Sequence, residues 1–124
     1  MKYIILLYGN QEAWNTLTES AVDELASAHT TLQRDLRMSG EFVESSEIDE
    51  NTAAVIRSEE GVVTESKGPL IEGRFIVSGY YIVDCADMSR AKEIARRFAE
   101  VKFAPVEVRR LGDGSTWTEL QDQR

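Results

Sequence analysis

His29 is the only histidine among 124 residues, and an imidazole is the side chain that most readily moves protons near neutral pH. It follows Val22 by seven residues and precedes Leu36 by seven, within a segment whose apolar residues recur at helical spacing. This spacing predicts that the imidazole points toward the protein interior. Two interpretations stay open: a core histidine hydrogen-bonded to a neighbour, or a general acid or base beside a small substrate.

Further ionisable side chains surround the dipeptide Gly68-Pro69. Glu72 follows it closely, and we expect this carboxylate either to orient the histidine or to lie on a water-exposed rim. Lys67 and Arg74 place two cations around the same loop, where they would attract a carboxylate or phenolate ligand or pair with neighbouring glutamates. The predicted catalytic residues are therefore His29 and Glu72.

Aromatic side chains supply candidate pocket walls. Tyr80 and Tyr81 are adjacent in a predicted strand, so their side chains point to opposite faces. We expect the one that faces the helices to be core and the other to line a cleft. Trp14 comes from a polar loop and either closes the pocket or fastens the loop. The predicted ligand-binding residues are Trp14, Lys67, Arg74, Tyr80 and Tyr81.

Several classes of function are disfavoured by what the sequence contains. A single histidine with scattered carboxylates has no recognised metal-ligand spacing, and there is no glycine-rich phosphate loop or nucleophile elbow, so we predict neither metal nor cofactor. Fourteen basic and 22 acidic side chains give a net charge of -8, which repels nucleic acid and anionic lipid. Basic residues between positions 90 and 102 alternate with Glu93 and Glu100, which predicts a solvated helix face.

The compartment is predicted from the lone cysteine and the apolar segments. Cys85 has no intrachain partner, as is usual in a reducing environment. The apolar run 3–8 is shorter than a signal-peptide core, and no other stretch reaches the roughly 20 apolar residues of a membrane helix. We therefore expect a cytoplasmic protein without membrane contact.

Periodicity predicts the elements that position these residues. Residues 3–8 and 75–85 read as strong strands, 106–111 as a last strand, and 41–47, 51–58 and 62–64 as a meander of short strands. A first helix begins near Thr18, with Ser20 and Asp23 in cap spacing, and ends at Ser39-Gly40. A second helix that ends before Pro105 is predicted from the apolar positions Ala91, Ile94, Ala95, Phe98 and Val101.

This order predicts an α+β protein with a ferredoxin-like split βαβ arrangement and an inserted β-hairpin. Both helices would cover one sheet face, and the apolar opposite face predicts a homodimer. We assign residues 1–111 to the domain and 112–124 to a C-terminal tail. The tail carries Trp117 and is either a clasp on the partner or mobile.

Residues 1–111 resemble the YCII-related family of the DGPF type in four places that occur in the family's order. They are the opening strand with Gly9 and Trp14; the helix positions His29, Leu36 and Gly40; the segment Lys67-Gly68-Pro69-Leu70 with Glu72 and Arg74; and the closing strand 79–84. The resemblance implies a dimeric α+β barrel with a cleft near the helix histidine and the Gly-Pro loop. Lys67 and Leu70 replace the signature aspartate and phenylalanine, so no mechanism through that aspartate is carried over.

Two functions follow from these observations. The first is a small-molecule-binding dimer that catalyses proton transfer, such as a lyase or isomerase step, on an organic acid or phenol. The alternative is a catalytically inactive accessory or regulatory dimer that acts through a protein partner, in keeping with the lost signature aspartate. Neither the substrate nor the reaction is encoded in a motif.

Overall fold

The computed structural model describes residues 1–123. Its elements, in chain order, are β1 (Lys2–Asn10), α1 (Gln11–Trp14), α2 (Glu19–Ser39), β2 (Phe42–Glu47), β3 (Ala54–Glu59), β4 (Val62–Lys67), β5 (Phe75–Asp84), α3 (Met88–Ala95), the 3-10 helix η1 (Ala99–Lys102), β6 (Val106–Arg110) and α4 (Ser115–Asp122).

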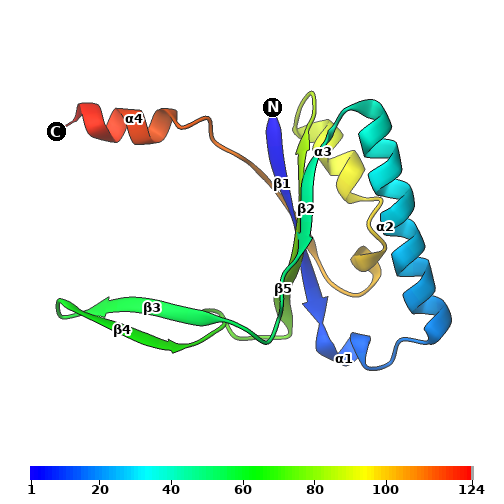
Figure 1. Ribbon diagram of the computed structural model, residues 1–124, viewed down its shortest axis with the longest axis horizontal. Coiled ribbons are helices and arrows are strands. Elements are labelled where there is room, and N and C mark those ends of the chain that lie inside the picture. The colour runs from blue at the N-terminus through cyan, green and yellow to red at the C-terminus, as the bar shows by residue number, and fades with distance from the viewer. Residues whose placement is uncertain (124) are drawn as a thin grey trace.

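Four strands form an antiparallel sheet in the order β2-β5-β1-β6. The halves β1-α2-β2 and β5-α3-β6 interlock in it, which is the split βαβ arrangement of a ferredoxin-like fold. Both long helices, α2 and α3, cover the same face of the sheet (Figure 1). The predicted α+β fold is therefore confirmed.

The core lies between this sheet face and the two helices. Tyr3, Ile5 and Leu7 alternate along β1 and are at most 5% exposed, because every second side chain of a strand points to the same face. Tyr81 and Val83 of β5 lie opposite β1 in the same layer. The helices contribute Leu32, Leu36, Ala91, Ile94 and Ala95 to the same cluster. Each large aliphatic side chain buried here contributes roughly 1.5–3 kcal/mol.

Helix α2 is delimited by side-chain and glycine caps. The hydroxyl of Thr18 accepts a hydrogen bond from the Ala21 amide at 3.1 Å, so the N-cap is Thr18 and the predicted Ser20 cap is wrong. At the other end Gly40 has φ of 79°, a left-handed conformation that costs glycine little, and the predicted end at Ser39-Gly40 is confirmed.

The second predicted helix is interrupted. Helix α3 ends at Ala95, and Phe98 is extended, with ψ of 125°, before the short helix η1 begins. The chain turns in between, so residues after Phe98 do not continue the face on which helical spacing would place them. Glu100, predicted to be solvated, is instead 6% exposed, and that prediction is wrong.

The inserted hairpin is a separate sheet. Strands β3 and β4 pair only with each other, around a turn in which Glu60 and Gly61 have positive φ, whereas β2 pairs with β5. The predicted continuous meander is therefore wrong, while the inserted hairpin is present. Helix α4 lies in the segment predicted as a tail, and its Trp117 is 75% exposed.

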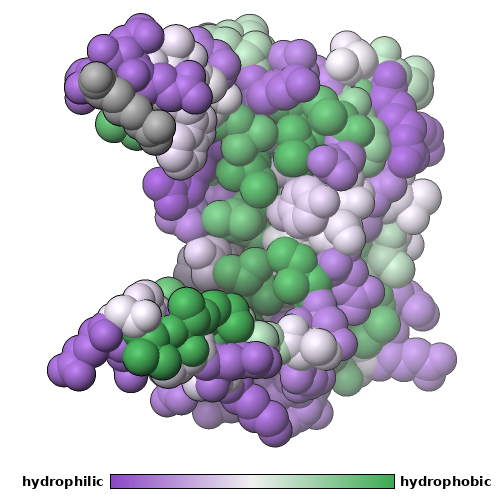
Figure 2. Space-filling view, turned by 60° about the vertical axis from the view of Figure 1, so that its left-hand side comes forward, coloured by the Kyte–Doolittle hydropathy of each residue, from purple (hydrophilic) through white to green (hydrophobic). Residues whose placement is uncertain are grey.

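The hairpin and α4 project from the two ends of the sheet on the side away from α2 and α3 (Figure 1). Between these two arms lies the open face of the sheet, and apolar side chains gather in the hollow (Figure 2). By strand register, this face carries the half-buried residues Ile4, Leu6, Tyr80 and Ile82. Within residues 1–123, no helix is both long and apolar enough to span a bilayer.

Candidate functional site

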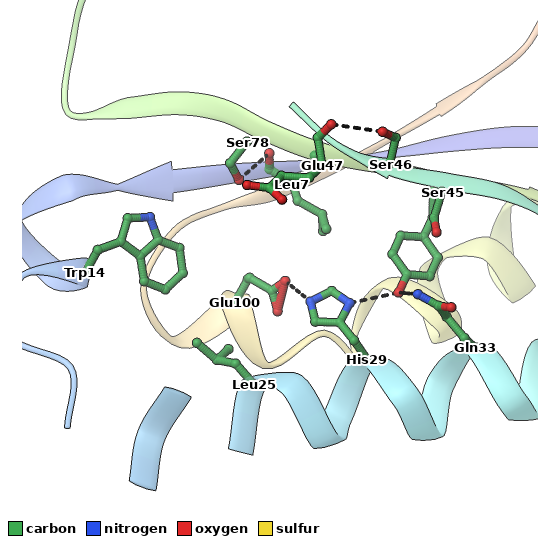
Figure 3. A pocket seen from close by; sticks show the side chains of 12 residues that line it. Leu7, Trp14, Leu25, His29, Gln33, Ser45, Ser46, Glu47, Ser78 and Glu100 are labelled. Atoms are coloured by element: carbon green, nitrogen blue, oxygen red, sulfur yellow. Dashed lines mark hydrogen bonds and ion pairs between the residues drawn. The ribbon is translucent and has the colours of Figure 1, made fainter. Parts of the chain in front are cut away.

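A cavity of about 460 Å³ lies on the helix side of the sheet, within the volume range of small-molecule pockets. Elements from most of the chain form its wall, as Figure 3 shows. Its lining residues are Leu7, Trp14, Leu25, His29, Gln33, Ser45, Ser46, Glu47, Ser78, Gly79, Tyr81 and Glu100. Strands β1, β2 and β5, helices α1 and α2, and η1 all contribute.

His29 is held at both ring nitrogens. Its Nε2 lies 2.5 Å from Oε2 of Glu100, and its Nδ1 lies 2.8 Å from the hydroxyl of Tyr81. The predicted inward direction of the imidazole is confirmed, since its side chain is 29% exposed and points from α2 toward the sheet (Figure 3). Glu100 joins it from η1, and Tyr81 from β5.

The hydrogen-bond roles follow from the carboxylate. Ionised Glu100 has no proton to donate, so Nε2 of His29 carries the hydrogen. In the neutral imidazole, Nδ1 is then an acceptor for the Tyr81 hydroxyl. Gln33 Nε2 donates to the same Tyr81 oxygen at 2.9 Å. Four side chains thus form one directed chain of hydrogen bonds from Gln33 to Glu100.

Aromatic packing holds the phenol ring in place. The ring of Phe98 meets the Tyr81 ring edge to face, with centroids 4.8 Å apart, and lies 5.7 Å from the imidazole. The ring of Phe42 also meets the Tyr81 ring in a T-shaped geometry, with centroids 6.1 Å apart. Burial raises the pKa of the Tyr81 phenol above its ordinary value of 10.0, opposed by the Gln33 hydrogen bond. At neutral pH this group is a phenol and not a phenolate.

Among residues 1–123, Glu100 is the one polar or charged residue that is buried. Its side chain is 8% exposed, and its second oxygen, Oε1, is buried without a hydrogen-bond partner in the part of the chain described. A buried unpaired carboxylate oxygen is costly. Such atoms are expected where a ligand or a water completes the site.

Three of the predicted site residues meet at this cavity: Trp14, His29 and Tyr81. The ring of Trp14 also packs against the ring of Phe103 in a tilted geometry, with centroids 5.7 Å apart and an interplanar angle of 50°. Tyr81 is both core and cavity wall, because the cavity lies on the helix side and not on the opposite face.

The other predicted site residues lie elsewhere. Lys67, Glu72 and Arg74 are exposed, in or next to the loop between β4 and β5, and none lines the cavity. Arg74 is placed over the Phe75 ring at 5.6 Å. Tyr80 points to the open sheet face, where its hydroxyl donates to Glu44 at 3.3 Å.

Gln33 and Glu100 are site residues that the sequence reasoning missed. Gln33 follows His29 by one helical turn, and this i, i+4 spacing could have identified it. Glu100 left no comparable signal, because its position depends on the interruption after α3. Over residues 1–123, no cluster of three or more His, Cys, Asp or Glu side chains is arranged to hold a metal ion.

The fold and site together define a ferredoxin-like α+β domain with a cavity between its sheet and its first long helix, lined by both apolar and hydrogen-bonding side chains. The model of the YCII-related domain matches residues 1–113, about nine tenths of the 124 residues. The chain belongs to this family, as the resemblance implied. No curated protein matches the chain. Helix α4 begins beyond the matched region.

Proposed function

We propose that the protein binds a small molecule in this cavity and transfers a proton between the ligand and His29, with Tyr81 as the intermediate carrier. The observation that carries the proposal is the hydrogen-bonded chain of Tyr81, His29 and Glu100 in the cavity wall. Because Nδ1 of His29 is engaged by the Tyr81 hydroxyl, the imidazole reaches the ligand through that oxygen.

The transfer moves two protons. A ligand C–H or O–H gives its proton to the Tyr81 oxygen while the phenol proton passes to Nδ1 of His29, so that the phenol is neutral before and after. The raised pKa of Tyr81 favours this coupled route over a free phenolate. Glu100 then stabilises the imidazolium, in the way that a carboxylate supports histidine in catalytic triads. Lyase and isomerase steps use such transfers.

The single histidine provides the test. Small molecules are screened by their effect on the imidazole NMR resonances of His29, and each ligand found is incubated with the protein in D₂O. We expect an acidic C–H of a bound ligand to exchange for deuterium faster with protein than without. Tyr81→Phe should still bind the ligand, yet exchange it roughly 100-fold more slowly. Ligands that leave His29 unaffected, or exchange that Tyr81→Phe retains, would contradict the proposal.

We propose further that two copies pair through the open sheet face to form a homodimer. The half-buried side chains Ile4, Leu6 and Ile82 leave an apolar surface between the two arms (Figure 2). Exposed apolar residues also lie on the arms, Ile56 and Val63 on the hairpin and Trp117 on α4. Because the hairpin and α4 project from opposite ends of the open sheet face, a second copy related by two-fold symmetry could lie between them.

An accessory role without chemistry is the less supported candidate. It was suggested by Lys67 in place of the signature aspartate, but Lys67 does not line the cavity. Among the residues that do line it, the imidazole of His29 hydrogen-bonds both the phenol of Tyr81 and the carboxylate of Glu100. The proton-transfer proposal uses all three.

A further inference from the structure

We infer that the ligand of this cavity is a small organic ammonium ion, and not an organic acid. The inference rests on the proposed function, and it specifies the class of molecule that the cavity takes. Of the lining residues, Glu47 and Glu100 carry carboxylates and none is lysine or arginine. The only basic group in the wall is His29, whose Nε2 is already paired with Glu100.

Three guanidinium groups from α2, α3 and the segment after α3 contact other side chains, and none of the three lines the cavity. Arg97 pairs with Asp35 at 2.6 Å, and Arg90 pairs with Glu41 at 2.8 Å. Arg37 lies over the ring of Phe42, 4.6 Å from its centroid. An anionic ligand would therefore enter an acidic pocket of a protein with net charge -8 and find no free cation in the wall.

The unpaired oxygen of Glu100 is an independent indication that the ligand carries a hydrogen-bond donor. Oε2 of this 6% exposed residue accepts from His29, while Oε1 has no partner among the described residues. Figure 3 shows this carboxylate between Trp14 and His29, amid the side chains of the cavity. A buried carboxylate oxygen gains most from a charged N–H donor, which an ammonium group supplies and a carboxylate ligand lacks.

The rest of the wall suits the organic part of such a cation. The indole of Trp14 is part of the wall, and indole rings attract ammonium groups by cation–π interaction. Leu7 and Leu25 provide apolar contact for a short carbon skeleton. Glu47, exposed on β2, adds a second negative charge to the same wall.

The experiment compares three probes of similar shape and different charge: benzylamine, benzyl alcohol and benzoate. Each is titrated into the full chain near neutral pH, and binding is followed by the His29 imidazole resonances and by calorimetry. We expect benzylamine to bind roughly tenfold more tightly than benzyl alcohol, and benzoate to bind most weakly. Benzoate binding as tightly as benzylamine, or more tightly, would overturn the inference.

Two matched substitutions locate the charge preference. Glu47→Gln should weaken benzylamine binding several-fold and leave benzyl alcohol unchanged. Glu24→Gln removes the same charge from an exposed position of α2 outside the cavity, and should change neither. Equal loss in both variants would mean that overall charge, and not the cavity, selects the amine, and would overturn the inference. A failure of all three probes to affect His29 would instead refute the proposed binding function itself.

Discussion

At the scale of single residues, the carboxylate of Glu100 is the feature that favours the proposed proton transfer over a purely structural role for His29. Its carboxylate contacts Nε2 of His29 on the side opposite Tyr81, so it can stabilise the imidazolium without touching the transferred proton. In the proposed transfer Glu100 therefore positions and stabilises His29 through Oε2, which leaves Oε1 for the ligand's ammonium group, and Tyr81 is the group that exchanges a proton with the ligand.

Replacing the Glu100 carboxylate by an amide tests the effect of its negative charge while the size of the side chain is kept. Glu100→Gln keeps the side-chain volume and an acceptor for Nε2–H but removes the negative charge, so we expect a folded protein whose ligand C–H exchange in D₂O falls roughly tenfold or more. Glu93→Gln removes a charge from α3, where Glu93 pairs with Arg90 at the surface, and should exchange normally. Unchanged exchange in Glu100→Gln would exclude a role for the charge.

Tyr81 also predicts how stability depends on alkaline pH. Its pKa in the folded state is raised by burial, so the folded protein prefers the neutral phenol more strongly than the unfolded chain does. This contribution is fully present below the ordinary value of about 10 and is lost as pH rises through the folded-state pKa. Urea denaturation from pH 8 to 11 should show a decline in the free energy of unfolding that is shallower in Tyr81→Phe. Tyr8, Tyr80 and Cys85 have raised pKa values too, so a residual decline is expected.

At the scale of elements, α2 carries His29 and Gln33, and its ends fix where these two side chains lie. Gly40 is left-handed at the C-terminal cap, and a Cβ added there would meet no other atom within 4 Å. Gly40→Ala should therefore lower the free energy of unfolding by about 1 kcal/mol through backbone strain alone. Gly112→Ala is the control, because Gly112 also has open space but no positive φ, and should change stability by less than about 0.5 kcal/mol. Equal effects in urea denaturation would contradict this account.

Helices and strands could be predicted where the local sequence pattern determines them, and not where contacts between distant residues do. Alternation and helical spacing predicted β1, β5, β6 and α2, including the end of α2 at Gly40, since those signals are local. The interruption after α3 was missed because Phe98 and Val101 continue the helical spacing. What favours the extended Phe98 is a tertiary contact, its ring against Tyr81. Of the residues that line the candidate cavity, the sequence therefore indicated His29, Trp14 and Tyr81, while the position of Glu100 depended on that contact.

At the scale of the whole molecule, the open sheet face makes the homodimer testable. Ile82 lies on that face beside Ile4 and Glu44, so Ile82→Lys would place a charge within the proposed interface. We expect sedimentation equilibrium to show a dimer for the natural chain and a dissociation constant raised at least tenfold for Ile82→Lys. Val101→Lys adds the same charge on η1, at a side chain that is already 52% exposed, and should stay dimeric. A natural chain that is monomeric at all concentrations would refute the homodimer.

The two tryptophans lie in two different places, one in the cavity wall and the other on the arm α4. Trp14 is half-buried in the cavity wall, and Trp117 is 75% exposed on the arm α4. Their fluorescence should therefore differ, with bluer emission from the shielded indole and redder emission from the solvated one. With Trp117→Phe the remaining emission should report the proposed ligand binding, and with Trp14→Phe it should report the proposed subunit association. The natural chain thus contains a separate optical probe for each proposed event, without any attached dye.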